Sequence, residues 1–174
     1  MIRYPLTYNP ILEYWEEIES GKVIVGDKVR RIYKHLVSKL NNDKESEFEY
    51  DPERANHAIE FIENFTCHSK GKLGGTKVVL ETWQKAFLGA VFGFIHKIDG
   101  TRQYREFLLI VARKNGKSLI SSAIALYLQV ADGEPGAEIY SVSTKRDSAK
   151  IVWLEAKRMV QKSPVLLKRL KGKG

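Results

Sequence analysis

The chain has 174 residues, of which 43% are hydrophobic and 29% are charged, as in globular proteins with a sizeable core. The 29 Lys and Arg outnumber the 21 Asp and Glu, and the net charge of +8 favours a polyanionic partner, nucleic acid before an acidic membrane; a merely basic surface is the alternative. The single Cys67 excludes an intramolecular disulfide, and the sequence has neither an apolar signal core nor an apolar stretch of the ~20 residues that span a bilayer.

The first 75 residues are predicted to form a helical lead-in. Apolar residues recur at helical spacing over residues 10–19, 27–40 and 51–65, with polar loops expected at 41–49 and 69–75. Pro10 and Pro52 occupy first-turn positions, where the missing N–H of proline costs nothing. Asp27 and Asp51 stand where a capping side chain is expected.

From residue 76 onward, extended segments alternate with helices. Strands or extended segments are predicted at 77–80, 104–111 and 137–143, and helices at 81–92, 117–130, 145–162 and 164–170. The unbroken apolar run 107–112 is typical of a strand that is covered on both faces. This alternating order predicts an α/β fold, with a right-handed parallel crossover between the two clear strands.

The segment Val111–Ser118 (VARKNGKS) is predicted to be a phosphate-binding loop, because it lies between a predicted strand and a predicted helix. Gly116 would let the backbone approach phosphate closely, Lys117 would reach the β- and γ-phosphates, and the Ser118 hydroxyl would bind Mg²⁺. The full motif begins with Gly, and this chain has Val111 there. The alternative is a surface turn with a solvated lysine.

Several segments together resemble the large terminase subunit of tailed bacteriophages, the motor that packages viral DNA. Its phosphate loop is similar in lacking the leading Gly and in carrying an Arg just inside the loop. The segment Glu81–Phe87 (ETWQKAF) resembles the family's adenine-recognition element, and Glu138–Val152 resembles its strand and helix after the loop. Asp51–Ala55 and Phe61–Glu63 fit its helical lead-in.

The resemblance implies an incomplete P-loop NTPase-type three-layer sandwich in residues 76–174, with ATP and Mg²⁺ as cofactors. It implies that Arg113 acts on the γ-phosphate and that Lys114 and Asn115 line the loop; a solvated surface arginine is the alternative for Arg113. Gln84 would bind the adenine edge, with an exposed polar helix residue as the alternative. Trp83 and Phe87 are expected in the core.

The same resemblance implies double-stranded DNA as substrate, and a portal, a small terminase subunit and a ring of copies as partners. It places the protein in the cytoplasm of an infected or lysogenic bacterial host, neither secreted nor in a membrane.

ATP hydrolysis needs a second strand that ends in acidic residues, for Mg²⁺ and for the attacking water. After Ser118 the predicted strand at 137–143 runs into Thr144 and Lys145 instead. We therefore expect an N-terminal fragment of the ATPase domain, without the catalytic acids and the nuclease domain, that hydrolyses little ATP. Another P-loop NTPase, such as a helicase, and a non-catalytic nucleic-acid-binding or assembly module with a vestigial loop are the alternatives.

Basic residues gather near the C-terminal end of the sequence, at positions 157, 158, 162, 168, 169, 171 and 173. They suit a track for DNA phosphates, and a solvated helix face is the alternative.

Overall fold

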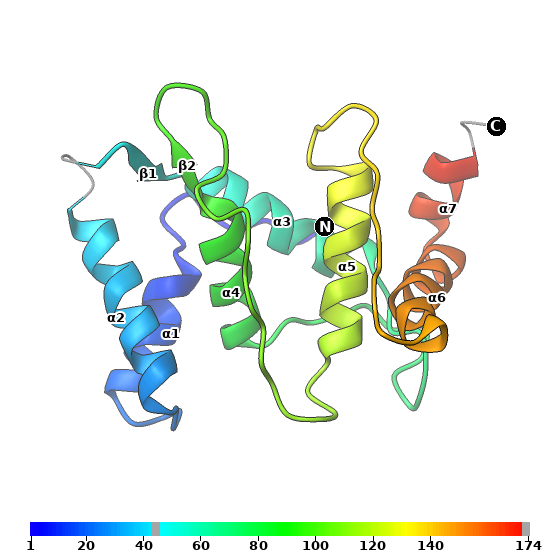
Figure 1. Ribbon diagram of the computed structural model, residues 1–174, viewed down its shortest axis with the longest axis horizontal. Coiled ribbons are helices and arrows are strands. Elements are labelled where there is room, and N and C mark those ends of the chain that lie inside the picture. Colours follow the sequence, from blue (N-terminus) through cyan, green and yellow to red (C-terminus); the bar gives the residue numbers. More distant parts are fainter. Residues whose placement is uncertain (43–45, 172–174) are drawn as a thin grey trace. The chain divides into compact units, whose positions relative to one another are not determined.

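The computed structural model describes residues 1–42 and 46–171 and consists of helices with one small sheet (Figure 1). The helices are α1 (Pro10–Glu19), α2 (Asp27–Asn41), α3 (Pro52–Phe65), α4 (Thr82–Gly93), α5 (Lys117–Val130), α6 (Arg146–Lys162) and α7 (Pro164–Lys171). The strands are β1 (Phe48–Tyr50) and β2 (Phe94–His96). This mixture of helices and a sheet is compatible with the α/β class.

Contacts divide the chain into two compact units, and each unit combines segments that are separated in the sequence. Unit 1 comprises Met1–Ile2, Glu60–Val79 and Leu109–Gly174, and unit 2 comprises Arg3–Ile59 and Leu80–Leu108. The division at residue 75 that the sequence predicts stays a prediction about domains.

Unit 2 packs α1 against α2 and α4 around a core of aromatic and aliphatic side chains. Helix α1 begins where the Asn9 Oδ1 accepts hydrogen bonds from the amides of Ile11 (3.0 Å) and Leu12 (3.4 Å). Ile11, Tyr14 and Ile18 then lie on one buried stripe, because three- and four-residue steps return to the same helix face. Trp83 packs against this core, as the sequence predicts.

The sheet of unit 2 is an antiparallel pair that joins Phe48 to His96 and Tyr50 to Phe94. The ring of Tyr50 lies over the glycines of α4. A Cβ atom on Gly93 would overlap this ring, and one on Gly89 would come within 2.7 Å of the Pro10 Cγ. The two glycines therefore bring the helix close to β1 and α1.

Unit 1 places α5 beside α6, and α6 beside α7 (Figure 1). The buried face of α5 includes Ile120, Ile124 and Tyr127, and the Tyr127 ring meets Phe61 edge to face at 5.5 Å. The Ser122 hydroxyl donates a hydrogen bond of 2.8 Å to the Val152 carbonyl of α6. These contacts fix the helix that follows the predicted phosphate loop.

The helices agree with the sequence predictions to within about two residues at their ends. Asp51 caps α3 as predicted, because its Oδ1 accepts hydrogen bonds from the amides of Glu53 (2.8 Å) and Arg54 (3.1 Å). The prediction that Asp27 caps α2 is wrong: Gly26 holds that position without a side-chain cap, and Asp27 is the first residue of the helix.

The two strands predicted at 104–111 and 137–143 are wrong for the described residues, and with them the parallel crossover. Both segments lack a strand ladder, and the sheet of the described chain is β1–β2. The side chains of Ile110 and Val142 are 81% and 89% exposed. The two segments therefore have the composition of strands but no neighbouring strand to pair with. Strand propensity expresses packing against neighbours, and it forms no sheet where neighbours are missing.

Candidate nucleotide-binding site

The predicted phosphate loop is a tight turn that leads directly into α5. Lys114 has a φ of +69°, which is the one positive φ of a non-glycine residue in the described chain, and Gly116 has a φ of +72°. Left-handed residues turn the backbone amides of a loop toward one side. Glycine adopts this conformation at no steric cost, whereas a lysine there costs about 1–2 kcal/mol.

Helix α5 begins at this turn with open amides. Gly116 is its N-cap and offers no side chain, and the first backbone hydrogen bond runs from the Ile120 amide to the Gly116 carbonyl at 2.9 Å. The amides of the first helical turn therefore have no internal acceptor. Together with the helix dipole they favour an anion at this position.

Lys117 folds back across the loop. Its Nζ donates a hydrogen bond of 3.0 Å to the carbonyl oxygen of Val111, six residues earlier. The contact keeps the ammonium group on the loop 111–117, where its positive charge would add to the attraction for phosphate. The side chains of Arg113, Asn115 and Ser118 are exposed.

Metal binding at this loop would depend on few protein atoms. The described residues include no group of three or more His, Cys, Asp or Glu side chains that could hold a metal ion. Magnesium retains several waters and binds through substrate phosphates and one or two protein oxygens. The exposed Ser118 hydroxyl in the first turn of α5 fits such a ligand.

Gln84 belongs to unit 2, whereas the loop belongs to unit 1. Gln84 is buried, and its Oε1 accepts a hydrogen bond of 3.0 Å from the Glu81 amide. The Glu81 side chain accepts in return from the backbone of Gln84, which completes a capping box at the start of α4. The alternative of an exposed polar residue is therefore wrong, and the adenine role stays a prediction.

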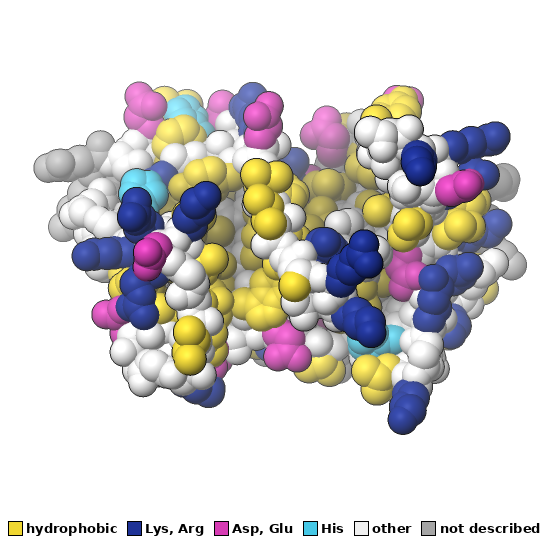
Figure 2. All heavy atoms as spheres, turned by 60° about the horizontal axis from the view of Figure 1, so that its bottom comes forward, with side chains coloured by type: hydrophobic (Ala, Val, Ile, Leu, Met, Phe, Trp, Pro, Cys, Tyr) yellow, Lys and Arg dark blue, Asp and Glu magenta, His cyan; other side chains and the backbone are white. Residues whose placement is uncertain are grey.

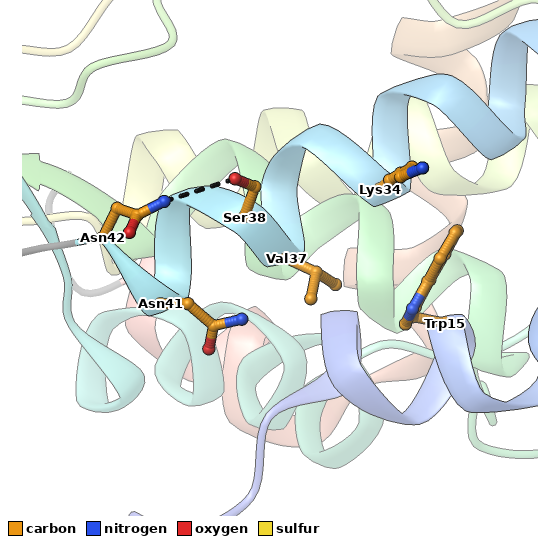
Figure 3. A pocket seen from close by; sticks show the side chains of 6 residues that line it. All are labelled: Trp15, Lys34, Val37, Ser38, Asn41 and Asn42. Atoms are coloured by element: carbon orange, nitrogen blue, oxygen red, sulfur yellow. Dashed lines mark hydrogen bonds between the residues drawn. The ribbon is translucent and has the colours of Figure 1, made fainter.

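A cavity of about 320 Å³ lies between α1 and α2 of unit 2 (Figure 3). Its lining consists of Trp15, Lys34, Val37, Ser38, Asn41 and Asn42. None of the site residues predicted from the sequence lines it. The candidate site therefore rests on the loop before α5 and not on this cavity.

Comparison with known proteins gives a family for the chain. A family model described as terminase large subunit, ATPase domain, matches residues 82–173, which is more than half of the sequence. This chain belongs to the terminase large subunit ATPase family. The match covers both Gln84 and the whole loop before α5.

The terminase large subunit of Enterobacteria phage HK97 is 33% identical over 114 residues, which cover 65% of this chain. The matched part is 21% of the length of that protein, so this terminase chain spans about a fifth of its relative. No solved structure matches. Among the described residues no helix is long and apolar enough to cross a bilayer.

Sequence reasoning missed two structural features of the candidate site residues. The capping box could have been found, because Glu81 and Gln84 have the three-residue spacing of that motif. The left-handed Lys114 has no sequence signal, since lysine does not favour this conformation.

Proposed function

We propose that the loop 111–118 binds ATP with Mg²⁺ and that the chain is the N-terminal part of the ATPase domain of a phage DNA-packaging motor. The observation that carries the proposal is the loop itself: a left-handed Gly116, a first turn of α5 without a side-chain cap, and a Lys117 ammonium bonded to the Val111 carbonyl of the loop. Such a site attracts a phosphate chain and does not by itself select the nucleoside attached to it.

Each site residue then has a separate role. The backbone of Lys114, Asn115 and Gly116 would surround the phosphates, and Lys117 would bind the β- and γ-phosphates. Arg113 is exposed in the same loop and would neutralise charge that develops on the γ-phosphate. Bound Mg²⁺ would neutralise the phosphate charge during transfer, with the Ser118 hydroxyl as its protein ligand. Gln84 would bind the adenine edge.

We further propose that residues 104–111 and 137–143 are strands of a three-layer sandwich in the assembled ATPase domain. Their apolar composition and high exposure support this role. The sequence after Ser118 offers no strand that ends in acidic residues, so this chain by itself should hydrolyse ATP far below the ~1 s⁻¹ at the low end of typical enzymes.

The whole motor supplies the biological setting of the proposal. Its substrate would be double-stranded DNA, its partners a portal, a small terminase subunit and further copies in a ring, and its location the cytoplasm of the bacterial host. The family match favours this setting over a helicase-like NTPase. A non-catalytic module with a vestigial loop differs in one respect: Lys117→Ala would leave its function unchanged.

Calorimetry with Mg-ATP tests the proposed site. We expect the wild-type chain to bind Mg-ATP, and Lys117→Ala to bind at least tenfold more weakly because it removes the ammonium beside the loop. Lys168→Ala, which removes an exposed lysine of α7, is the matched control and should bind like the wild type. A folded wild-type chain that binds no Mg-ATP, or a Lys117→Ala variant that binds normally, would contradict the proposal.

A further inference from the structure

The net positive charge of the chain comes from unit 1 alone. Counted from the sequence, unit 1 has sixteen Lys and Arg against seven Asp and Glu, a net charge of +9. Unit 2 has thirteen Lys and Arg against fourteen Asp and Glu, a net charge of −1, and the two values add to the +8 of the chain. Figure 2 shows dark blue side chains gathered on the right, the side on which Figure 1 draws α5, α6 and α7. Such asymmetry indicates a polyanion-binding surface on that unit.

Within unit 1, helix α6 presents a basic stripe that consists of Arg146, Lys150, Trp153 and Lys157. Steps of four, three and four residues keep these side chains on one face of the helix. All four are exposed, and Trp153 is 58% exposed. The Lys157 Nζ lies 5.1 Å from the centre of the Trp153 ring, a cation–π contact that holds the lysine at the surface.

The opposite face of α6 contacts residues 69–70, in the loop between α3 and α4. The Ser69 hydroxyl donates a hydrogen bond to Glu155, and the Lys162 Nζ donates one of 2.9 Å to the Ser69 carbonyl. The Lys70 Nζ lies 3.9 Å from the Glu155 Oε2 and forms an ion pair with it. Lys162, which the sequence placed in a DNA track, therefore has a structural partner. Glu155 and Lys162 are seven residues apart and lie on the side of α6 away from the basic stripe.

The cations of the basic stripe have no comparable partners. None of Arg146, Lys150 and Lys157 takes part in an ion pair within residues 1–42 and 46–171. The one acid beside them in the first turn of α6 is Asp147. Their charge is thus available to an anionic ligand. From Arg146 to Lys157 the stripe extends about 16 Å along the helix, at 1.5 Å per residue.

We propose that the basic stripe of α6 binds the phosphate backbone of duplex DNA without reading its sequence. Three cations along one helix face, one of them packed on the exposed ring of Trp153, suit a regular line of phosphates. A membrane surface fits less well, since an interfacial helix buries a broad apolar face in the lipid. The apolar face of α6 instead packs in unit 1, where Met159 is fully buried. The choice of DNA rests on the proposed function.

Fluorescence anisotropy with a labelled 20-base-pair duplex, at several salt concentrations, tests the proposal on the 174-residue chain. The variant Arg146→Gln, Lys150→Gln, Lys157→Gln removes the cations of the stripe. Its matched control is Lys28→Gln, Arg31→Gln, Lys34→Gln, which removes two lysines and one arginine from the exposed surface of α2 in unit 2. Both variants lower the net charge by three, so a difference between them reports position and not total charge.

We expect the stripe variant to raise Kd at least tenfold and to reduce the salt slope of log K by about 2–3, near 0.9 for each lost phosphate contact. The α2 control should stay within about twofold of the wild type. Duplex DNA should also quench the fluorescence of the wild-type chain more than that of Trp153→Phe. Circular dichroism checks that each variant is folded.

Equal weakening by the two triple variants would overturn the proposal, as would a folded wild-type chain that binds no duplex. Stronger binding to vesicles of anionic phospholipid than to the duplex would overturn it in favour of a membrane. ATP binding is measured on the same proteins. If the stripe variant alone loses DNA and the wild type binds no ATP, the proposed function fails and the inference stands. If Lys117→Ala loses ATP binding and both triple variants keep DNA binding, the proposed function stands and the inference about the basic stripe fails.

Discussion

Gln84 has a structural role at a position where the family resemblance predicts a ligand contact. Its Oε1 is engaged by the Glu81 amide, and its side chain is buried. The side-chain NH₂ group is a separate donor that the capping box does not use. An adenine contact would therefore have to use this NH₂ group or break the box.

A pair of variants separates the two roles of Gln84. Glu81→Ala and Gln84→Ala each remove one half of the capping box, and each should lower the free energy of unfolding by about 1 kcal/mol, measured in urea. If Gln84 also contacts adenine, Gln84→Ala should reduce the preference for ATP over GTP, and Glu81→Ala should leave it unchanged. An equal loss of preference in both variants would mean that the start of α4 matters and the amide does not.

Lys114 is the other informative single residue. A lysine in the left-handed region is strained by about 1–2 kcal/mol, and such strain persists where the surrounding structure enforces it. In this chain it occurs two residues before the N-cap of α5, inside the predicted phosphate loop. The strain is thus located where the open amides of α5 would meet a phosphate.

At the scale of elements, two glycines allow α4 to pack closely against β1 and α1. Gly93 ends α4 against the ring of Tyr50 from β1, and Gly89 lies against Pro10 at the start of α1. Replacing glycine by alanine usually stabilises a helix by up to about 1 kcal/mol. At Gly93 the added Cβ meets an aromatic ring, and overpacking of this kind typically costs 1–3 kcal/mol.

We therefore expect Gly93→Ala to lower the free energy of unfolding by about 1–2 kcal/mol, despite its better helix propensity. Urea unfolding measures the change. The double variant Tyr50→Leu, Gly93→Ala supplies the control, because a smaller side chain at position 50 leaves room for the new methyl group. The double variant should be less destabilised than the sum of the two single changes. Additive effects, or a stabilised Gly93→Ala, would contradict this account of the packing.

The helices could be predicted from sequence because their signals are local. Asn9, Asp51 and the 3.6-residue periodicity of α1 act within a few residues of the chain. The strands depend on distant partners: Phe48 pairs with His96, and three-residue strands have no periodicity to detect. The loop before α5 was predicted for the same reason as the helices, since Gly116 and Lys117 adjoin the helix that they serve.

At the scale of the whole molecule, two kinds of surface are distributed unevenly. Unit 1 carries the excess positive charge, and the chain also exposes two extended apolar segments, 104–111 and 137–143. Exposed segments of this composition offer unpaired backbone groups to other strands. If these segments are strands of the assembled ATPase domain, their exposure in the isolated chain leaves them free to pair with other copies.

We expect the chain to self-associate as its concentration rises, through strand pairing of these segments, and Ile110→Lys to reduce this association because a charged edge resists pairing. Sedimentation velocity over a range of concentrations measures the effect. Ile32→Lys makes the same change on the exposed face of α2, where Ile32 is 56% exposed, and should leave self-association unchanged. If both lysine variants suppress association equally, added charge explains the result and pairing does not. A wild-type chain that stays monomeric at every concentration would argue that the segments are satisfied as they are, and would weaken their assignment as strands of a larger sheet.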